Sequence, residues 1–156
     1  MRRLVLVLTL LLPSRVFAQG SVVLTVTGGP VTVPAPAVAD YNAGFVLDPA
    51  ALSYSVAISG GPPTMLRSTT VSIRATSGSF GTLPVGDLQW ERSDLTTWNS
   101  LTTTDVQVEA RTGLQRTLGN TNWSNSVHFR CLIAWTNTPP ATYSTNIIVT
   151  LTVTSP

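Results

Sequence analysis

The chain has 156 residues and few charges, with nine arginines, no lysine and seven carboxylates. Its many Thr, Ser, Val, Pro and Gly residues favour short strands and tight turns over helices. The scattered arginines argue against a nucleic-acid surface, and a lone cysteine, Cys131, excludes an intrachain disulfide. We expect one packed domain whose stability comes from its core.

Residues 1–18 have the composition of a secretory signal peptide. Two arginines open the chain, residues 4–12 form an apolar stretch too short to span a bilayer, and a small-x-small cleavage site ends at Ala18. Cleavage would remove three arginines and leave six against seven carboxylates, a net charge of about −1. We expect a protein that is secreted, periplasmic or displayed on the cell surface, with no stable membrane span.

Residues 19–51 form an N-terminal region of different composition. Val22, Leu24 and Val26 occupy alternate positions, and a stretch rich in Pro and Gly follows them. The region is either an edge strand with its connection or an extended arm. The repeated prolines favour the edge strand.

Residues 52–156 carry short alternating runs at the spacing of a β-sandwich, separated by Gly and Pro turns, and no window has a helical period. The pattern predicts an all-β fold, an antiparallel sandwich of about seven to nine strands. The predicted strands are 52–58, 70–75, 87–91, 105–110, 114–118, 126–135 and 147–154.

The last two predicted strands are the longest, and the Pro139-Pro140 loop separates them, which favours an antiparallel hairpin. One face of the final strand is apolar and the other is rich in Thr. The apolar face consists of Ile147, Val149, Leu151 and Val153. In strand 126–135, the residues expected to face the core are Val127, Phe129, Cys131, Ile133 and Trp135.

Two of these strands resemble parts of immunoglobulin-like domains. Residues 88–90 resemble strand C, with Trp90 as the core tryptophan, and residues 128–135 resemble strand F, with Cys131 at the second conserved cysteine. The first cysteine is missing from the strand that carries Val71 and Ile73. The resemblance implies an Ig-like sandwich without a disulfide over about two-thirds of the chain, and it implies no function.

The end of the chain resembles the closing strand of bacterial surface and pilin-like subunits, including the spore-coat-U type. Thr142 and Tyr143 match the turn before that strand, whereas Ala141 replaces its usual Gly. Either this strand simply closes the sheet beside Phe129, or the domain exchanges strands with a neighbour. The candidate assembly residues are Val22, Leu24, Val26, Ile147, Val149, Leu151 and Val153.

Few residues have catalytic potential. His128, the only histidine, falls on the polar face of its strand, and Cys131 falls on the apolar face. The acidic residues around 87–94 lack the spacing of a Ca²⁺ loop. We therefore predict no catalytic site, no metal site and no cofactor. The competing enzyme class is a glycan hydrolase that uses Glu91, Asp94, Asp105 or Glu109.

Trp98 and Trp123 lie in polar stretches rich in turn residues. Such tryptophans either cap the ends of the core, which we favour, or form a platform for a sugar ring. The sequence thus predicts an exported, non-enzymatic structural or adhesive protein of the cell envelope or surface. Its partners would be further copies of itself or other envelope proteins. The alternative is a soluble carbohydrate-binding module that uses the two tryptophans to bind a glycan.

Overall fold

A computed structural model describes residues 21–155, and the predicted signal peptide lies outside them. Strands dominate and pack as antiparallel sheets, so the predicted all-β class is confirmed. Within residues 21–155, seven strands have five or more residues, and six have two or three. Among these residues no helix is long and apolar enough to cross a membrane.

The larger sheet contains six strands, all in antiparallel pairs. Its order is β1 (Ser21–Thr27), β4 (Leu52–Ser59), β11 (Asn122–Leu132), β8 (Leu88–Arg92) and β9 (Asn99–Ser100), and β3 (Phe45–Leu47) also pairs with β11. The smaller sheet has the order β10 (Val106–Leu114), β5 (Arg67–Ala75) and β13 (Ile147–Thr154).

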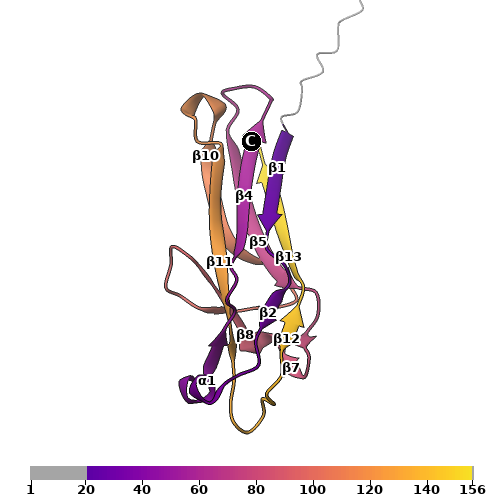
Figure 1. The fold of residues 1–156 in the computed structure, drawn as a ribbon. Coiled ribbons are helices and arrows are strands. Elements are labelled where there is room, and N and C mark those ends of the chain that lie inside the picture. Colours follow the sequence, from indigo (N-terminus) through magenta and orange to yellow (C-terminus); the bar gives the residue numbers. More distant parts are fainter. Residues whose placement is uncertain (1–20, 156) are drawn as a thin grey trace, which may run out of the picture.

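Two short strand pairs and three short helices complete the fold. The strand pairs are β2 (Val31–Val33) with β12 (Tyr143–Thr145), and β6 (Ser79–Phe80) with β7 (Leu83–Pro84). The helices are α1 (Val38–Ala43) and the 3-10 turns η1 (Val85–Asp87) and η2 (Arg116–Leu118). The molecule is elongated, with α1 and the loop between β11 and β12 at one end (Figure 1).

The core lies between the two sheets and follows from the alternation of β4, β5 and β11. Every second residue of β5 is buried from Arg67 to Ala75, as the two-residue period of a strand requires. Trp90 and Phe129 are partners across β8 and β11, and both are buried. Burial of each large apolar side chain contributes about 1.5–3 kcal/mol.

The predicted hairpin between the last two long strands is wrong. Strand β11 pairs with β3, β4 and β8, whereas β13 pairs with β5 in the other sheet. The intervening chain first forms β12 beside β2, and this pairing separates the two strands. Period-2 alternation fixes which face of a strand is buried, but it does not specify the strand's neighbour.

The predicted core position of Trp135 is also wrong. β11 ends at Leu132, and the Ala134 carbonyl accepts the N–H groups of Asn137 and Thr138. This turn leaves Trp135 60% exposed. The other four predicted core residues of this strand are buried: Val127, Phe129, Cys131 and Ile133.

Other differences occur where the chain turns. The weak strand predicted at 114–118 is wrong, because β10 ends at Leu114 and η2 follows it before Gly119, a left-handed residue with φ of 67°. Helix α1 was not predicted, because six residues are too few to display a helical period. Residues 21–27 form β1, an edge strand that pairs along its whole length with β4 of the same chain.

Candidate functional site

A pocket lies at the end of the sandwich where α1 meets the loop after β11. Helix α1 stops at Gly44, whose φ of 80° is left-handed and whose N–H bonds to the Asp40 carbonyl. The helix buries Tyr41, and the Tyr41 hydroxyl donates a 2.6 Å hydrogen bond to the Thr138 carbonyl. This bond ties the helix to the loop across 97 positions of sequence.

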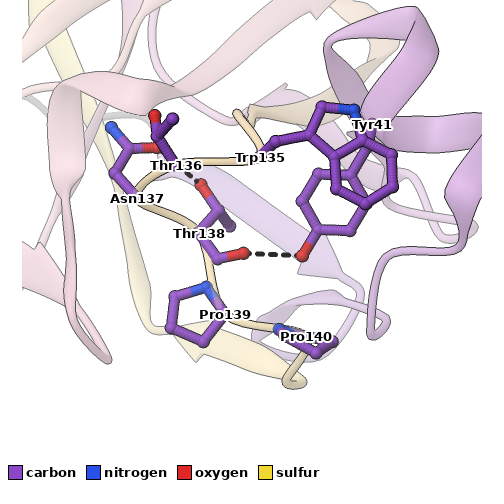
Figure 2. Close-up of a pocket in the computed structure, with 7 residues that line it drawn as sticks. All are labelled: Tyr41, Trp135, Thr136, Asn137, Thr138, Pro139 and Pro140. Carbon is purple, nitrogen blue, oxygen red and sulfur yellow. Dashed lines mark hydrogen bonds between the residues drawn. The ribbon is translucent and has the colours of Figure 1, made fainter.

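The indole of Trp135 stacks on this anchored tyrosine. The two ring centroids are 4.3 Å apart and the rings are inclined by 21°. Figure 2 shows the overlapping rings and the bond from Tyr41 to Thr138. One face of the indole is therefore supported by protein, while much of the ring remains open to solvent.

The loop that carries Trp135 is held by its own hydrogen bonds. Thr138 is buried, and its hydroxyl accepts the N–H of Ala134. The N–H of Ile133 bonds to the carbonyl of Gly44, which links the loop to the end of α1 a second time. The pocket has a volume of about 400 Å³. Its lining consists of Tyr41, Trp135, Thr136, Asn137, Thr138, Pro139 and Pro140.

The predicted binding residue Trp123 is in the core. It is only 7% exposed, its ring meets Tyr54 edge-on at 5.9 Å, and the Arg111 guanidinium lies 4.6 Å from its ring centroid. Arg111 therefore lies over one face of the ring. Of the two alternatives for Trp123, this buried position corresponds to a tryptophan that caps the core, and not to a platform for a sugar ring.

The other predicted binding residue, Trp98, is half-buried. The Arg130 guanidinium lies 4.3 Å from its ring centroid and 5.2 Å from that of Phe45, and it also donates a 2.8 Å hydrogen bond to Gln89. Arg130 and Trp123 both belong to β11 and are seven positions apart, which corresponds to about 23 Å along a strand. The structure therefore does not bring Trp98 and Trp123 into one platform.

Sequence reasoning missed Trp135 and Tyr41 as a candidate site. Apolar residues recur at every second position from Val127 onward in β11, and Trp135 continues this pattern beyond Ile133. The pattern therefore predicts that Trp135 faces the core. The signal against that position is the run of turn residues that follows, Thr-Asn-Thr-Pro-Pro at 136–140. No sequence signal pairs Tyr41 with Trp135, because their contact depends on where α1 docks.

The candidate assembly strands β1 and β13 lie side by side at one side of the sandwich (Figure 1). Each is the outermost strand of its own sheet, and β1 and β13 do not hydrogen-bond to each other. Val26 and Val153 are exposed. The remaining assembly residues are partly buried against the core: Val22, Leu24, Ile147, Val149 and Leu151.

The strands at the two ends of each large sheet's strand order differ in how they are protected from pairing. Strand β10 has two register shifts and carries Glu109 and Arg111, and β9 has only two residues. Strands β1 and β13 have seven and eight residues, no charge, no proline and an unbroken register. Charges, bulges and short length are what natural sheets use to prevent edge pairing, so β1 and β13 form an unprotected side.

Three of the four carboxylates proposed for the competing hydrolase are engaged by other side chains. Glu109 is buried, accepts hydrogen bonds from Tyr54, Arg111 and Asn125, and lies 3.9 Å from Arg92. Together these partners contact both of its carboxylate oxygens.

Two further carboxylates have arginine partners nearer the surface. Asp94 binds Arg92, and this hydrogen bond lowers the pKa of Asp94 below its ordinary value. Asp105 lies 3.4 Å from Arg74. Glu91, half-buried on β8, is the fourth carboxylate proposed for a hydrolase.

Cys131 and His128 have the environments that their alternation predicts. Cys131 is buried with a free thiol, and burial, with a smaller contribution from the charge of Asp87, raises its pKa from 9.0 to about 12. His128 is exposed. Within residues 21–155, no three His, Cys, Asp or Glu side chains form a group that could hold a metal ion.

Comparisons of the chain with protein-family models, curated proteins and solved structures give no match. The resemblances to immunoglobulin-like domains and to pilin-like subunits therefore stay predictions.

Proposed function

We propose that the protein is an exported, non-enzymatic structural or adhesive module of the cell envelope or surface that assembles with further copies of itself through β1 and β13. The observation that carries the proposal is the contrast between this unprotected side and the protected strands β9 and β10. Export is inferred from the composition of residues 1–18, which lie outside the described residues.

Pairing at the unprotected side satisfies groups that the isolated chain leaves open. A strand at a sheet edge directs N–H and C=O groups outward at every second residue, and they form a template for another strand. Because β1 and β13 lie on the same side, a second copy that docks by its own unprotected side would extend both sheets at once. Val23 and Val26 on β1 and Val153 on β13 would lose exposed apolar surface in such an assembly.

The states of the reactive side chains support a non-enzymatic role. Glu109 is held by Tyr54, Asn125 and Arg111, so its oxygens are already committed to structure. The Cys131 thiol is buried and protonated at neutral pH, because its pKa is raised to about 12. Neither group is poised to act as a base or a nucleophile.

Lysine substitutions at the strand edges test assembly. Thr152→Lys on β13 and Val23→Lys on β1 place a charge at exposed positions of the unprotected side. We expect the chain from Gln19 to form oligomers whose mass rises with concentration in size-exclusion chromatography with light scattering, and each variant to shift them to monomers. Thr112→Lys, at an exposed position of β10, is the matched control and should behave as the wild type. A wild type that stays monomeric at every concentration contradicts assembly, and so does an equal effect of the control.

Export has a separate test. Expression of the full precursor followed by fractionation and N-terminal sequencing should give an exported chain that begins at Gln19. An exported chain that still begins at Met1, or a chain found only inside the cell, would contradict this part of the proposal without affecting the assembly test.

A further inference from the structure

The exposure of Trp135 has no explanation in the stability of the fold. Among residues 21–155 it is the one aromatic side chain that is exposed, at 60%. A tryptophan that serves only the core would bury most of its large apolar surface, as Trp90 and Trp123 do. The fold instead supports one face of this indole and presents the remainder to solvent.

The support beneath Trp135 is held by hydrogen bonds. Tyr41 is 9% exposed, and its hydroxyl is fixed by the 2.6 Å bond to the carbonyl of Thr138. The turn from Ala134 to Thr138 closes through backbone and hydroxyl hydrogen bonds. A ring that is already fixed loses little conformational entropy when a ligand stacks on it, so the arrangement favours binding.

The chemistry around the ring restricts the ligand. None of the seven lining residues carries a charge, so the pocket offers no cationic partner for a phosphate or a carboxylate. Thr136 and Asn137 are exposed and supply a hydroxyl and a side-chain amide on the side of the pocket opposite the indole (Figure 2). The volume of about 400 Å³ lies within the range of small-ligand sites.

The stacked geometry also distinguishes between neutral ligands. Tyr41 and Trp135 lie against each other at 4.3 Å, which leaves no slot between two rings for a proline side chain. A ligand can stack only on the outer face of the indole. A sugar ring has one apolar C–H face and a rim of hydroxyl groups, and it would place that face on Trp135 and direct hydroxyls into the uncharged pocket, whose opposite side carries Thr136 and Asn137.

We propose that the pocket at Tyr41 and Trp135 binds one ring of a neutral carbohydrate. The site lies at the end of the sandwich that carries α1, whereas β1 and β13 run along its side (Figure 1). Binding therefore goes beyond assembly and does not depend on it. It also places carbohydrate recognition away from Trp98 and Trp123, whose rings are covered by Arg130 and Arg111.

Affinity electrophoresis of the chain from Gln19 in native gels tests the proposal. The gels contain a soluble β-glucan, a mannan or a galactan, with a gel free of polysaccharide as the reference. We expect at least one polysaccharide to retard the wild type, and Trp135→Ala to weaken this binding by roughly ten-fold or more. Trp135→Phe should retain part of the binding because it keeps a ring face. Trp98→Ala is the matched control and should stay within about two-fold of the wild type.

Two results would overturn the proposal. One is a wild type that none of the three neutral polysaccharides retards. The other is a Trp135→Ala variant that is retarded as strongly as the wild type while its far-UV circular dichroism is unchanged. Both results leave the assembly proposal standing, because the variants of β1 and β13 are measured without polysaccharide.

Discussion

The phenol of Tyr54 on β4 donates a 2.8 Å hydrogen bond to the carboxylate of Glu109 on β10, and this bond joins the two sheets through the core. Glu109 also binds Arg111 at 2.8 Å and Asn125 at 3.2 Å. Glu109→Ala would leave the buried Tyr54 hydroxyl without its acceptor, whereas the exposed Arg111 would be solvated, so we expect the free energy of unfolding to fall by about 2–3 kcal/mol. Tyr54→Phe should cost only about 1–2 kcal/mol, since it removes one donor. Urea denaturation measures both values, and a loss below about 1 kcal/mol for Glu109→Ala would show that the network contributes little.

Stability should fall at alkaline pH. Burial raises the pKa of Cys131 from 9.0 to about 12. Burial and the bond to Glu109 also raise the pKa of Tyr54 above its ordinary value of 10.0. The unfolded chain releases these protons at lower pH than the folded chain does, so this stabilisation is complete below about pH 9 and is lost as the pH rises toward 12. Urea midpoints between pH 7 and 11 should therefore decrease, and less steeply for Cys131→Ala. Midpoints that stay constant above pH 9 are the contrary result.

The Cys131 thiol should react slowly in the native protein. At pH 8, a rise of the pKa from 9.0 to about 12 lowers the thiolate fraction roughly 1,000-fold, and burial limits access as well. We expect a chromogenic disulfide reagent to label the native chain at least about 100-fold more slowly than the chain unfolded in urea. Equal rates in the two states, or a disulfide-linked dimer, would show that the thiol is accessible.

Gly81, in the turn between β6 and β7, should not tolerate a side chain. Its φ of 62° is left-handed, and a Cβ at this position would lie 2.8 Å from Cδ1 of Tyr143. We expect Gly81→Ala to lower the free energy of unfolding by about 1–3 kcal/mol. Gly78→Ala is a close control, because a Cβ at Gly78 meets nothing within 4 Å. Similar urea midpoints for the two variants would contradict this account of the turn.

The sequence predicts the strands of this protein better than their partners. The alternation of β4, β5 and β11 reflects one buried face, and in β11 Val127, Phe129 and Cys131 are buried as predicted. The neighbour of each strand depends on contacts between distant segments. The pairing of β13 with β5 brings together residues that are more than seventy positions apart, such as Ile147 and Ala75. The two-residue period of apolar residues in a strand carries no information on which distant strand it pairs with. The predicted hairpin is wrong for this reason.

The candidate sites, like the fold, could be predicted from the sequence only in part. The apolar alternation of residues 22–26 and 147–153 marks two strands as assembly candidates, and the structure places these strands together at one side. Trp98 and Trp123 lie in polar segments, but Arg130 and Arg111, which come from other segments of the chain, lie over their rings. Trp135 belongs to an alternating run, yet a turn exposes it. Local composition therefore did not identify the open aromatic ring, because exposure is decided by tertiary contacts.

Amide hydrogen exchange of the chain from Gln19, measured residue by residue at low and high protein concentration, tests assembly through the unprotected side most directly. In β1 and β13, alternate amides point away from the only strand that each pairs with among the described residues. These outward amides should exchange rapidly in dilute protein and become protected as the concentration rises, while the outward amides of β10 keep the same rates. Rates in β1 and β13 that do not change with concentration, or protection that appears equally in β10, would contradict assembly through β1 and β13.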